Sequence, residues 1–274
     1  MSNGSTDRST IVLIHGLWMT ALSWEHWVTR YEAAGHRVIA RSWPGMEADI
    51  TEFRRDPSAV DHLGLEDIVD HYEAIIGGLD VAPIIMGHSF GGAITEILLD
   101  RGLGAAGVAI DAAAVKGITA LPLSELRSGF PVLKNPANYG RAVALTLDEF
   151  RYAFGNTLSD DASRAAFERY AVPGPGRVLF QGALANFNPH AATKVDFGND
   201  DRAPLLLIAG GSDHTVPAVI DRQAADWYAK SRATTAFKEF PGRSHWTIAE
   251  PGWEEVADYA LEWAVANARH LLEA

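Results

Sequence analysis

Short apolar segments alternate with amphipathic stretches along most of the chain. The apolar segments are rich in β-branched residues and too short for helices, which favours strands buried on both faces. They fall at residues 11–14, 38–40, 84–86, 108–110, 205–209 and 234–240. Apolar positions at helical spacing occupy the stretches between them, at residues 24–31, 65–75, 94–98, 217–230 and 256–263. This alternation predicts an α/β fold, a mostly parallel sheet with helices on both faces.

The first of these helices has recognisable ends. Ser23 precedes the apolar positions, and a serine side chain can accept a hydrogen bond from the free amides at a helix N-terminus. Gly35 follows the last apolar position, Tyr31, and glycine commonly ends helices. We therefore expect this helix to occupy the residues between Ser23 and Gly35.

The segment at residues 112–200 interrupts the alternation. It has no strand-like run as strong as those on either side, and its helical candidates at 148–154 and 160–170 are separated by prolines. A structureless loop of this length is uncommon inside a compact domain. We therefore expect a helical cap at 112–200, inserted into a core domain formed by residues 1–111 and 201–274.

Composition narrows the classes of function. The chain has 274 residues, of which 47% are hydrophobic, and this is ample for a large core. Its net charge of −12 argues against nucleic acids and anionic membranes as partners. It has no cysteine, which excludes disulfides, thiolate metal sites and a cysteine nucleophile. The N-terminus is polar and no apolar run approaches the ~20 residues of a membrane span, so we expect a cytoplasmic protein.

The strongest local signal is the sequence Gly87-His88-Ser89-Phe90-Gly91, which lies between a predicted strand and a predicted helix. It matches the G-x-S-x-G pattern of a serine nucleophile on a sharp turn. Side chains at the two glycine positions would collide with neighbouring backbone. The strained turn lifts the hydroxyl above the sheet, at a helix N-terminus whose dipole favours negative charge. Ser89 is therefore the candidate nucleophile, and the alternative is a serine that only caps the helix.

Two residues that follow later strands are suited to activate this serine. A serine hydroxyl becomes an effective nucleophile when a base removes its proton, and histidine can do so near neutral pH. His245 follows the last predicted strand, and Asp213 follows the strand before it. Both therefore lie at carboxyl ends of strands, where open α/β sheets bind ligands. We assign His245 as the base and Asp213 as the residue that orients it.

Other residues compete for these two roles. Asp111, at the end of the fourth predicted strand, is the alternative acid. His214 adjoins Asp213 and His88 adjoins Ser89, so each is an alternative base, although neither obviously points toward the serine. The sequence contains no histidine pair with zinc-site spacing and no phosphate-binding glycine loop, so we expect no metal and no cofactor.

Four elements together resemble the α/β-hydrolase superfamily, in its capped, esterase-like branch: His15-Gly16, the turn at 87–91, and the loops of Asp213 and His245. They span most of the chain. The resemblance implies an oxyanion hole formed by the backbone amides of Leu17 and Phe90. Preorganised donors of this kind are typically worth about 3 kcal/mol each in catalysis. We expect His15 to hold this loop rather than to carry a proton.

The chain departs from the family pattern in two places. Relatives usually begin with an antiparallel hairpin before the His-Gly strand, but only 14 residues precede His15, so we expect the hairpin to be missing. Many relatives carry Asp-x-x-Gly-x-Gly-x-Ser after the second strand, where this chain has the residues 41–46, Arg-Ser-Trp-Pro-Gly-Met. The second departure weakens an assignment to a named subfamily within that branch, but not the resemblance to the superfamily.

These residues imply a serine hydrolase that cleaves a small-molecule carboxylic ester or lactone through an acyl-enzyme. The superfamily also includes carbon–carbon bond hydrolases, hydroxynitrile lyases and perhydrolases with similar triads, and these alternatives stay open. A ligand receptor that turns over slowly is an alternative of another class. Aromatic side chains that could line the substrate pocket, suited to a small or medium apolar group, are Trp18, Trp246, Phe154 and Phe187.

Overall fold

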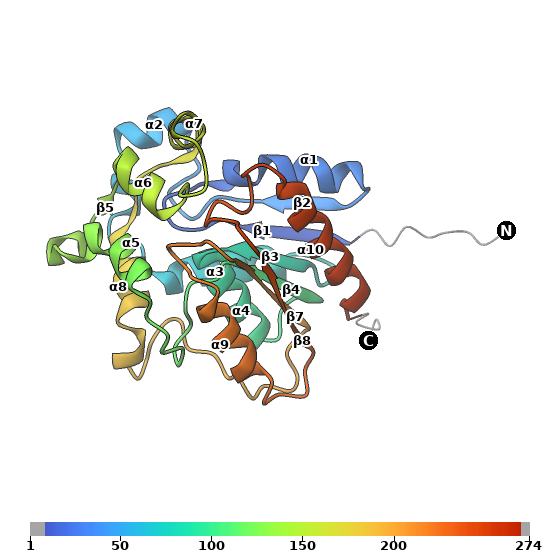
Figure 1. Cartoon of the computed structure of the whole chain (residues 1–274). Coiled ribbons are helices and arrows are strands. Elements are labelled where there is room, and N and C mark those ends of the chain that lie inside the picture. The colour runs from blue at the N-terminus through green and yellow to red at the C-terminus, as the bar shows by residue number, and fades with distance from the viewer. Residues whose placement is uncertain (1–8, 270–274) are drawn as a thin grey trace.

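A six-stranded parallel sheet forms the centre of the computed structural model, which describes residues 9–269 (Figure 1). The strand order is β2-β1-β3-β4-β7-β8, and every neighbouring pair is parallel. The strands are β1 (Thr10–Ile14), β2 (Arg37–Ala40), β3 (Ile84–His88), β4 (Ala106–Ile110), β7 (Leu205–Gly210) and β8 (Thr235–Phe240). The predicted fold class is confirmed, because all six apolar segments form strands of one sheet.

Burial explains why the strands could be found from their composition. Every residue of β3, β4 and β7 is buried, since helices cover both faces of the sheet there. The two edge strands are less buried, and they carry Arg37 on β2 and both Lys238 and Glu239 on β8. Charged side chains at sheet edges also hinder pairing with other chains.

Helices on the two faces of the sheet create two apolar cores. α1 (Glu25–Ala33) and α10 (Trp253–Asn267) cover one face, whereas α3 (Leu65–Gly77), α4 (Phe90–Asp100) and α9 (Val219–Tyr228) cover the other (Figure 1). Alternate residues of β1 serve the two cores: Ile11 and Leu13 pack toward α1, and Val12 and Ile14 pack toward α4.

The segment between β4 and β7 is mostly helical. It contains α5 (Leu123–Leu133), η3 (Pro136–Gly140), α6 (Leu147–Ala153), α7 (Asp160–Tyr170), α8 (Gly176–Ala183) and η4 (Ala185–Phe187). The two-residue strands β5 (Ala142–Val143) and β6 (Gly174–Pro175) pair antiparallel within it. The loops after β1, β7 and β8 all contact this segment, so it lies over the carboxyl ends of the strands. Its division from the core as a cap domain stays a prediction.

The start of the first helix differs from the prediction at Ser23. A 3₁₀ helix, η1 (Ala21–Trp24), precedes α1, and the Thr20 side chain accepts a hydrogen bond from the Leu22 amide at 3.3 Å. The Ser23 hydroxyl instead donates to the Thr20 carbonyl oxygen at 2.9 Å. The cap therefore lies three residues earlier, because the chain enters the helix through a tighter 3₁₀ turn.

Two short helices after β2 were not expected from the sequence: α2 (Ile50–Arg55) and η2 (Ser58–Val60). None of the helices in residues 9–269 has the length and apolar character needed to cross a membrane. β1 is the first strand within residues 9–269. The expectation that no hairpin precedes it falls on residues that lie almost entirely outside the described part of the chain.

Candidate active site

Ser89 stands on the sharp turn between β3 and α4. Its backbone has a φ of +57°, in a region that residues with side chains rarely adopt. The two flanking glycines permit this turn by close backbone approach. A Cβ at Gly87 would lie 1.9 Å from the Gly91 carbonyl oxygen, and one at Gly91 would lie 2.1 Å from the carbonyl oxygen of Ile14. The collisions expected from the sequence are therefore present at both positions.

Neighbouring backbone keeps Ser89 in this strained conformation. Its amide donates to the Ile110 carbonyl oxygen at 2.9 Å, which ties the turn to the end of β4. Its carbonyl oxygen accepts hydrogen bonds from the amides of Gly92, Ala93 and Ala113. Strain of this kind persists when surrounding contacts over-determine the backbone, and it is common at functional sites.

Asp213 and His245 meet at the carboxyl ends of β7 and β8. Asp213 Oδ2 lies 2.6 Å from His245 Nδ1, and both side chains are buried. Asp213 Oδ1 accepts hydrogen bonds from the amides of Thr215 and Val216 at 2.6 and 2.9 Å. A carboxylate can only accept, so the imidazole carries its proton on Nδ1 and Nε2 holds the lone pair. Within residues 9–269, this buried Nε2 has no hydrogen-bond partner.

Asp111, the alternative acid, lies below this pair without bonding to the imidazole. Its Oδ1 accepts a hydrogen bond from the Gly210 amide at 2.6 Å, and its Oδ2 is 4.0 Å from His88 Nε2. Burial, together with the nearby Asp213 carboxylate, raises the pKa of Asp111 well above its ordinary value. A carboxyl group that disfavours its charged form is poorly suited to stabilise an imidazolium.

The two alternative bases are held by backbone carbonyl groups. His214 Nδ1 donates to the Tyr152 carbonyl oxygen at 3.1 Å, and the two rings pack with centroids 4.6 Å apart. His88 Nε2 donates to the carbonyl oxygen of His245 at 2.8 Å. Burial, with a contribution from the nearby His245, lowers the pKa of His88 well below its usual range. His88 is therefore a neutral support under the candidate base.

The two predicted oxyanion amides belong to segments that flank Ser89. Phe90 begins α4, and Leu17 follows Gly16 in the loop after β1. A Cβ at Gly16 would lie only 2.7 Å from the Ser89 Cβ, so this loop touches the serine. Among the described residues, neither the Leu17 nor the Phe90 amide donates to a protein acceptor. Their role as an oxyanion hole stays a prediction.

His15 fixes the loop that carries Leu17. Its Nδ1 donates to the Gly16 carbonyl oxygen at 2.9 Å, and its Nε2 accepts from the Trp43 amide at 3.0 Å. Its ring also stacks on the Trp43 ring at 4.8 Å between centroids. Burial lowers the pKa of His15 to about 4, so the ring stays neutral and can accept this hydrogen bond near neutral pH.

Three of the four predicted pocket aromatics gather around the candidate base. The Phe154 ring lies edge-on to His245 with centroids 4.9 Å apart, and Trp18 packs edge-on to Phe154 at 6.2 Å. Trp246 also contacts Phe154, at 6.4 Å. Phe187 is not part of this cluster: it ends η4 with 85% of its surface exposed, so the structure gives no support to its predicted pocket role.

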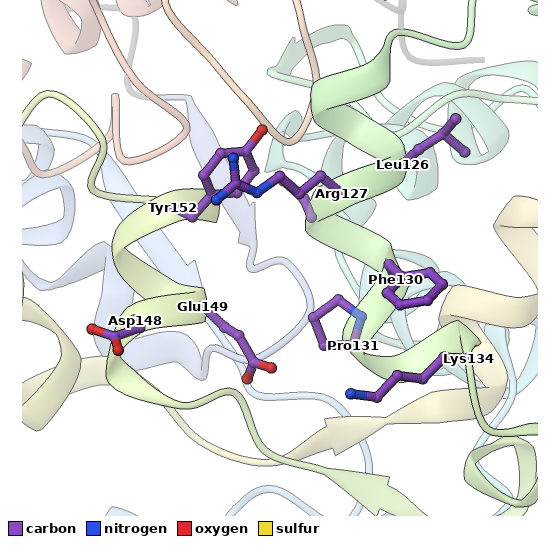
Figure 2. Close-up of a pocket in the computed structure, with 9 residues that line it drawn as sticks. Leu126, Arg127, Phe130, Pro131, Lys134, Asp148, Glu149 and Tyr152 are labelled. Atoms are coloured by element: carbon purple, nitrogen blue, oxygen red, sulfur yellow. The ribbon is translucent and has the colours of Figure 1, made fainter.

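One cleft borders this aromatic cluster through Trp18, and a second cleft lies between two helices of the segment that joins β4 and β7. One, of about 420 Å³, is lined by Trp18 together with Arg54, Ala144, Leu145, Phe167, Glu168, Ala171, Val172 and Pro173. The other, of about 600 Å³, lies between α5 and α6 (Figure 2). Figure 2 shows Arg127 extending from α5, Lys134 at the end of that helix, and Asp148 and Glu149 extending from α6. The Arg127 guanidinium carbon lies 3.9 Å from the centroid of the Tyr152 ring. Both volumes are typical of small-molecule sites.

Three side chains that could bind a metal lie close together beside the candidate acid and base. His88, Asp111 and His245 each place one potential ligand atom within 4.8 Å of the others. His88 Nε2 already donates to the carbonyl oxygen of His245, so its use as a metal ligand would break that hydrogen bond. We assign no metal site to this group.

The sequence analysis did not identify the residues that form hydrogen bonds to the loop of His245. Glu250 is buried and accepts hydrogen bonds from the Ser244 amide at 3.1 Å and the Ser244 hydroxyl at 2.8 Å. The Thr157 hydroxyl donates to the same carboxylate at 2.7 Å. No motif marks these residues, because Thr157 and Glu250 are 93 positions apart and meet only in the folded chain.

Comparisons with known proteins agree with this architecture. The model of the alpha/beta hydrolase family matches residues 11–259. A search of curated proteins found no match. Among solved structures, a monoacylglycerol lipase from Paleococcus ferrophilus is 21% identical, with 94% of this chain and 95% of that chain covered and a TM-score of 0.65.

Two further solved structures show the same fold. A pyrethroid hydrolase from Sphingobium faniae is 20% identical, with 94% and 98% of the two chains covered and a TM-score of 0.63. An extracellular α/β-hydrolase from a Paenibacillus species is 21% identical, with 95% and 99% covered and a TM-score of 0.64. Because the family model covers most of the sequence and the sheet has the matching parallel arrangement, this chain belongs to the α/β-hydrolase family.

Proposed function

We propose that this protein is a serine hydrolase that cleaves a carboxylic ester or lactone through an acyl-enzyme. The 2.6 Å contact between Asp213 and His245 carries the proposal, because it leaves a buried, unpaired Nε2 on the imidazole. The strained turn of Ser89 supplies a nucleophile of the kind that such a base activates. The family match supports the same reaction class.

In the proposed reaction, Ser89 Oγ attacks the carbonyl carbon and His245 Nε2 accepts its proton. Asp213 stabilises the resulting imidazolium, and the amides of Leu17 and Phe90 bind the oxyanion. The imidazolium then protonates the leaving alcohol, and water activated by the same imidazole releases the acid. Each oxyanion donor is expected to lower the barrier by about 3 kcal/mol, because the amides are fixed before charge develops.

The cleft beside Trp18 is the proposed pocket for an apolar part of the substrate. Trp18 directly follows Leu17, so this cleft begins next to the proposed oxyanion site. Its lining includes the cation Arg54, which is held by hydrogen bonds to the carbonyl oxygens of Ala171 and Phe167 at 2.8 and 3.3 Å. An ester with a small or medium apolar group suits this lining.

Replacing the nucleophile tests the proposal. We expect Ser89→Ala to lower kcat on short p-nitrophenyl esters by at least about 10³-fold, because the acyl-enzyme can no longer form. A fluorophosphonate probe should label the wild-type protein and leave Ser89→Ala unlabelled. Ser163→Ala is the matched control, since Ser163 is also buried but lies on α7. Undiminished hydrolysis by Ser89→Ala would contradict the proposal.

The same assay separates the alternatives. Rapid multiple turnover indicates an enzyme, whereas a single slow burst equal to the protein concentration indicates a ligand receptor with the triad retained. If ester hydrolysis is much slower than peracid formation, cyanohydrin cleavage or carbon–carbon bond cleavage, the triad would be assigned to the faster of these reactions instead.

A further inference from the structure

The end of α6 bonds to both loops that carry the candidate acid and base. We call residues 152–157, the carboxyl end of α6 and the turn after it, the clamp segment. On the acid loop, His214 Nδ1 donates to the Tyr152 carbonyl oxygen at 3.1 Å, and the Thr215 hydroxyl donates to that of Ala153 at 2.7 Å. On the base loop, the Trp246 amide donates to the Phe154 carbonyl oxygen at 3.1 Å.

Helix geometry explains why these carbonyl groups accept bonds from the loops. The last four carbonyl groups of a helix have no partner within it, and buried carbonyl groups need one. α6 ends at Ala153, so its final carbonyls point out of the helix toward the two loops. The acid and base loops thus supply hydrogen-bond donors to the carbonyl groups at the end of α6, and the same hydrogen bonds hold the two loops in place.

Two side chains of the clamp segment reach further into the same loops. Asn156 Nδ2 donates to the carbonyl oxygen of Ser212, the residue before Asp213, at 2.8 Å. The Thr157 hydroxyl donates to the Glu250 carboxylate at 2.7 Å. Asn156 therefore holds the acid loop, and Thr157 holds the residue that supports the base.

Glu250 transmits the second contact to His245. Its carboxylate accepts from the Ser244 amide and hydroxyl, and the Ser244 hydroxyl accepts from the Trp246 amide at 3.2 Å. The residues on both sides of His245 are thus fixed to Glu250, which is itself fixed to Thr157. All of these side chains except that of Thr157 are buried.

We propose that Asn156 and Thr157 are positioning residues that hold the acid and base loops at catalytic separation. This inference rests on the proposed hydrolase function. Asp213 and His245 come from different loops, after β7 and β8, and the clamp segment is bonded to both. A displacement of about 1 Å in a catalytic group can cost about 100-fold in rate, so the separation of these loops controls turnover.

Substitution of Thr157 tests the proposal. Thr157→Val keeps the shape of the side chain but removes the donor to Glu250, and we expect kcat to fall about tenfold while KM changes less than about twofold. Thr157→Ser keeps the hydroxyl and should restore kcat to within about twofold of the wild type. Asn156→Ala should likewise lower kcat and leave KM nearly unchanged.

Thr146→Val is the matched control on the same helix. Thr146 caps the opposite end of α6 from the clamp segment, by accepting from the Glu149 amide at 3.3 Å. It should lower the Tm about as much as Thr157→Val does and leave kcat at the wild-type value. An equal loss of kcat in Thr146→Val would overturn the proposal, because general weakening of α6 would then explain both results.

A double-mutant cycle with Glu250→Gln identifies the route of the effect. If Thr157 acts through Glu250, adding Thr157→Val to Glu250→Gln should lower kcat less than it does alone. Additive losses would overturn the assigned route. Wild-type kcat in both Thr157→Val and Asn156→Ala, with Ser89→Ala inactive, would overturn the clamp and leave the hydrolase proposal standing. Activity in Ser89→Ala would instead overturn the hydrolase proposal itself.

Discussion

At the scale of single residues, the candidate site depends on which atom carries a proton. Asp213 Oδ1 faces two backbone amides, and Oδ2 faces His245 Nδ1. This arrangement accepts three donors and keeps the lone pair of the imidazole on Nε2. Both carboxylate oxygens of Asp213 therefore accept hydrogen bonds, and an asparagine side chain has only one acceptor oxygen to offer.

Asp213→Asn should expose this requirement. The amide oxygen must stay opposite the two backbone donors, so the NH₂ group faces His245 Nδ1 and forces the ring proton onto Nε2. We expect kcat to fall by about 10⁴-fold with the fold preserved by circular dichroism, because the base has lost its lone pair. Asp111→Asn is the control, since the Asp111 side chain accepts from the Gly210 amide and not from His245, and it should keep kcat within about threefold of the wild type. The reverse ranking would assign the acid to Asp111.

At the scale of elements, α4 and α9 are joined by a buried polar contact. The Tyr228 hydroxyl on α9 donates to Glu96 on α4 at 2.9 Å. Burial raises the pKa of Glu96 to about 8, so the folded protein holds this carboxyl group in its neutral form at lower pH. The unfolded chain ionises it at its ordinary pKa of 4.5. Folded protein binds the extra proton, so stability falls as the pH rises between these two values.

Glu96→Gln should remove this pH dependence. Glutamine can still accept from Tyr228 but cannot ionise, so the variant escapes a cost of about 1.4 kcal/mol for each pH unit between 4.5 and about 8. We expect similar Tm values for the two proteins near pH 4.5 and a higher Tm for Glu96→Gln at pH 8. A lower Tm for the variant at pH 8 would show that Glu96 is ionised in the folded protein.

The elements also show what the sequence could and could not predict. Strands such as 84–88 were found because burial on both faces leaves a continuous apolar run, which is visible locally. The strained serine turn was found because its glycines are required by contacts within a few residues or with the adjacent strand. Asn156 was missed, because its partner Ser212 is 56 positions away and no periodic pattern links them. The exposure of Phe187 could not be predicted either, since an aromatic residue gives no local sign of facing solvent.

At the scale of the whole molecule, an ion pair fastens the segment between β4 and β7 to the core. Arg169 on α7 donates to Glu25 on α1 through Nε at 2.7 Å, and the Tyr170 hydroxyl donates to the same carboxylate at 2.5 Å. The Tyr170 ring in turn packs on Trp246 beside the candidate base, with centroids 5.1 Å apart. The Arg169 hydrogen bond lowers the pKa of Glu25, so this attachment is present above the ordinary pKa of glutamate and lost as the pH falls through the lowered value.

Glu25→Gln should loosen this attachment at neutral pH. We expect hydrogen–deuterium exchange in α7 to become several-fold faster, because both donors lose a charged acceptor, while exchange in α4 stays unchanged. Wild-type protein should show the same local increase only in acid. Glu32→Gln, at an exposed position on the same helix, is the control and should exchange like the wild type. Unchanged exchange in α7 of Glu25→Gln would show that the ion pair does not hold this helix.

The order of the strands has a consequence for the protein during its synthesis. Ser89 follows β3, whereas Asp213 and His245 follow β7 and β8, the last two strands to be synthesised among those in residues 9–269. A nascent chain that has folded its first four strands already has the serine turn but has neither partner for it. Because His245 directly follows β8 in the chain, the proposed triad cannot be complete before this edge strand has been synthesised.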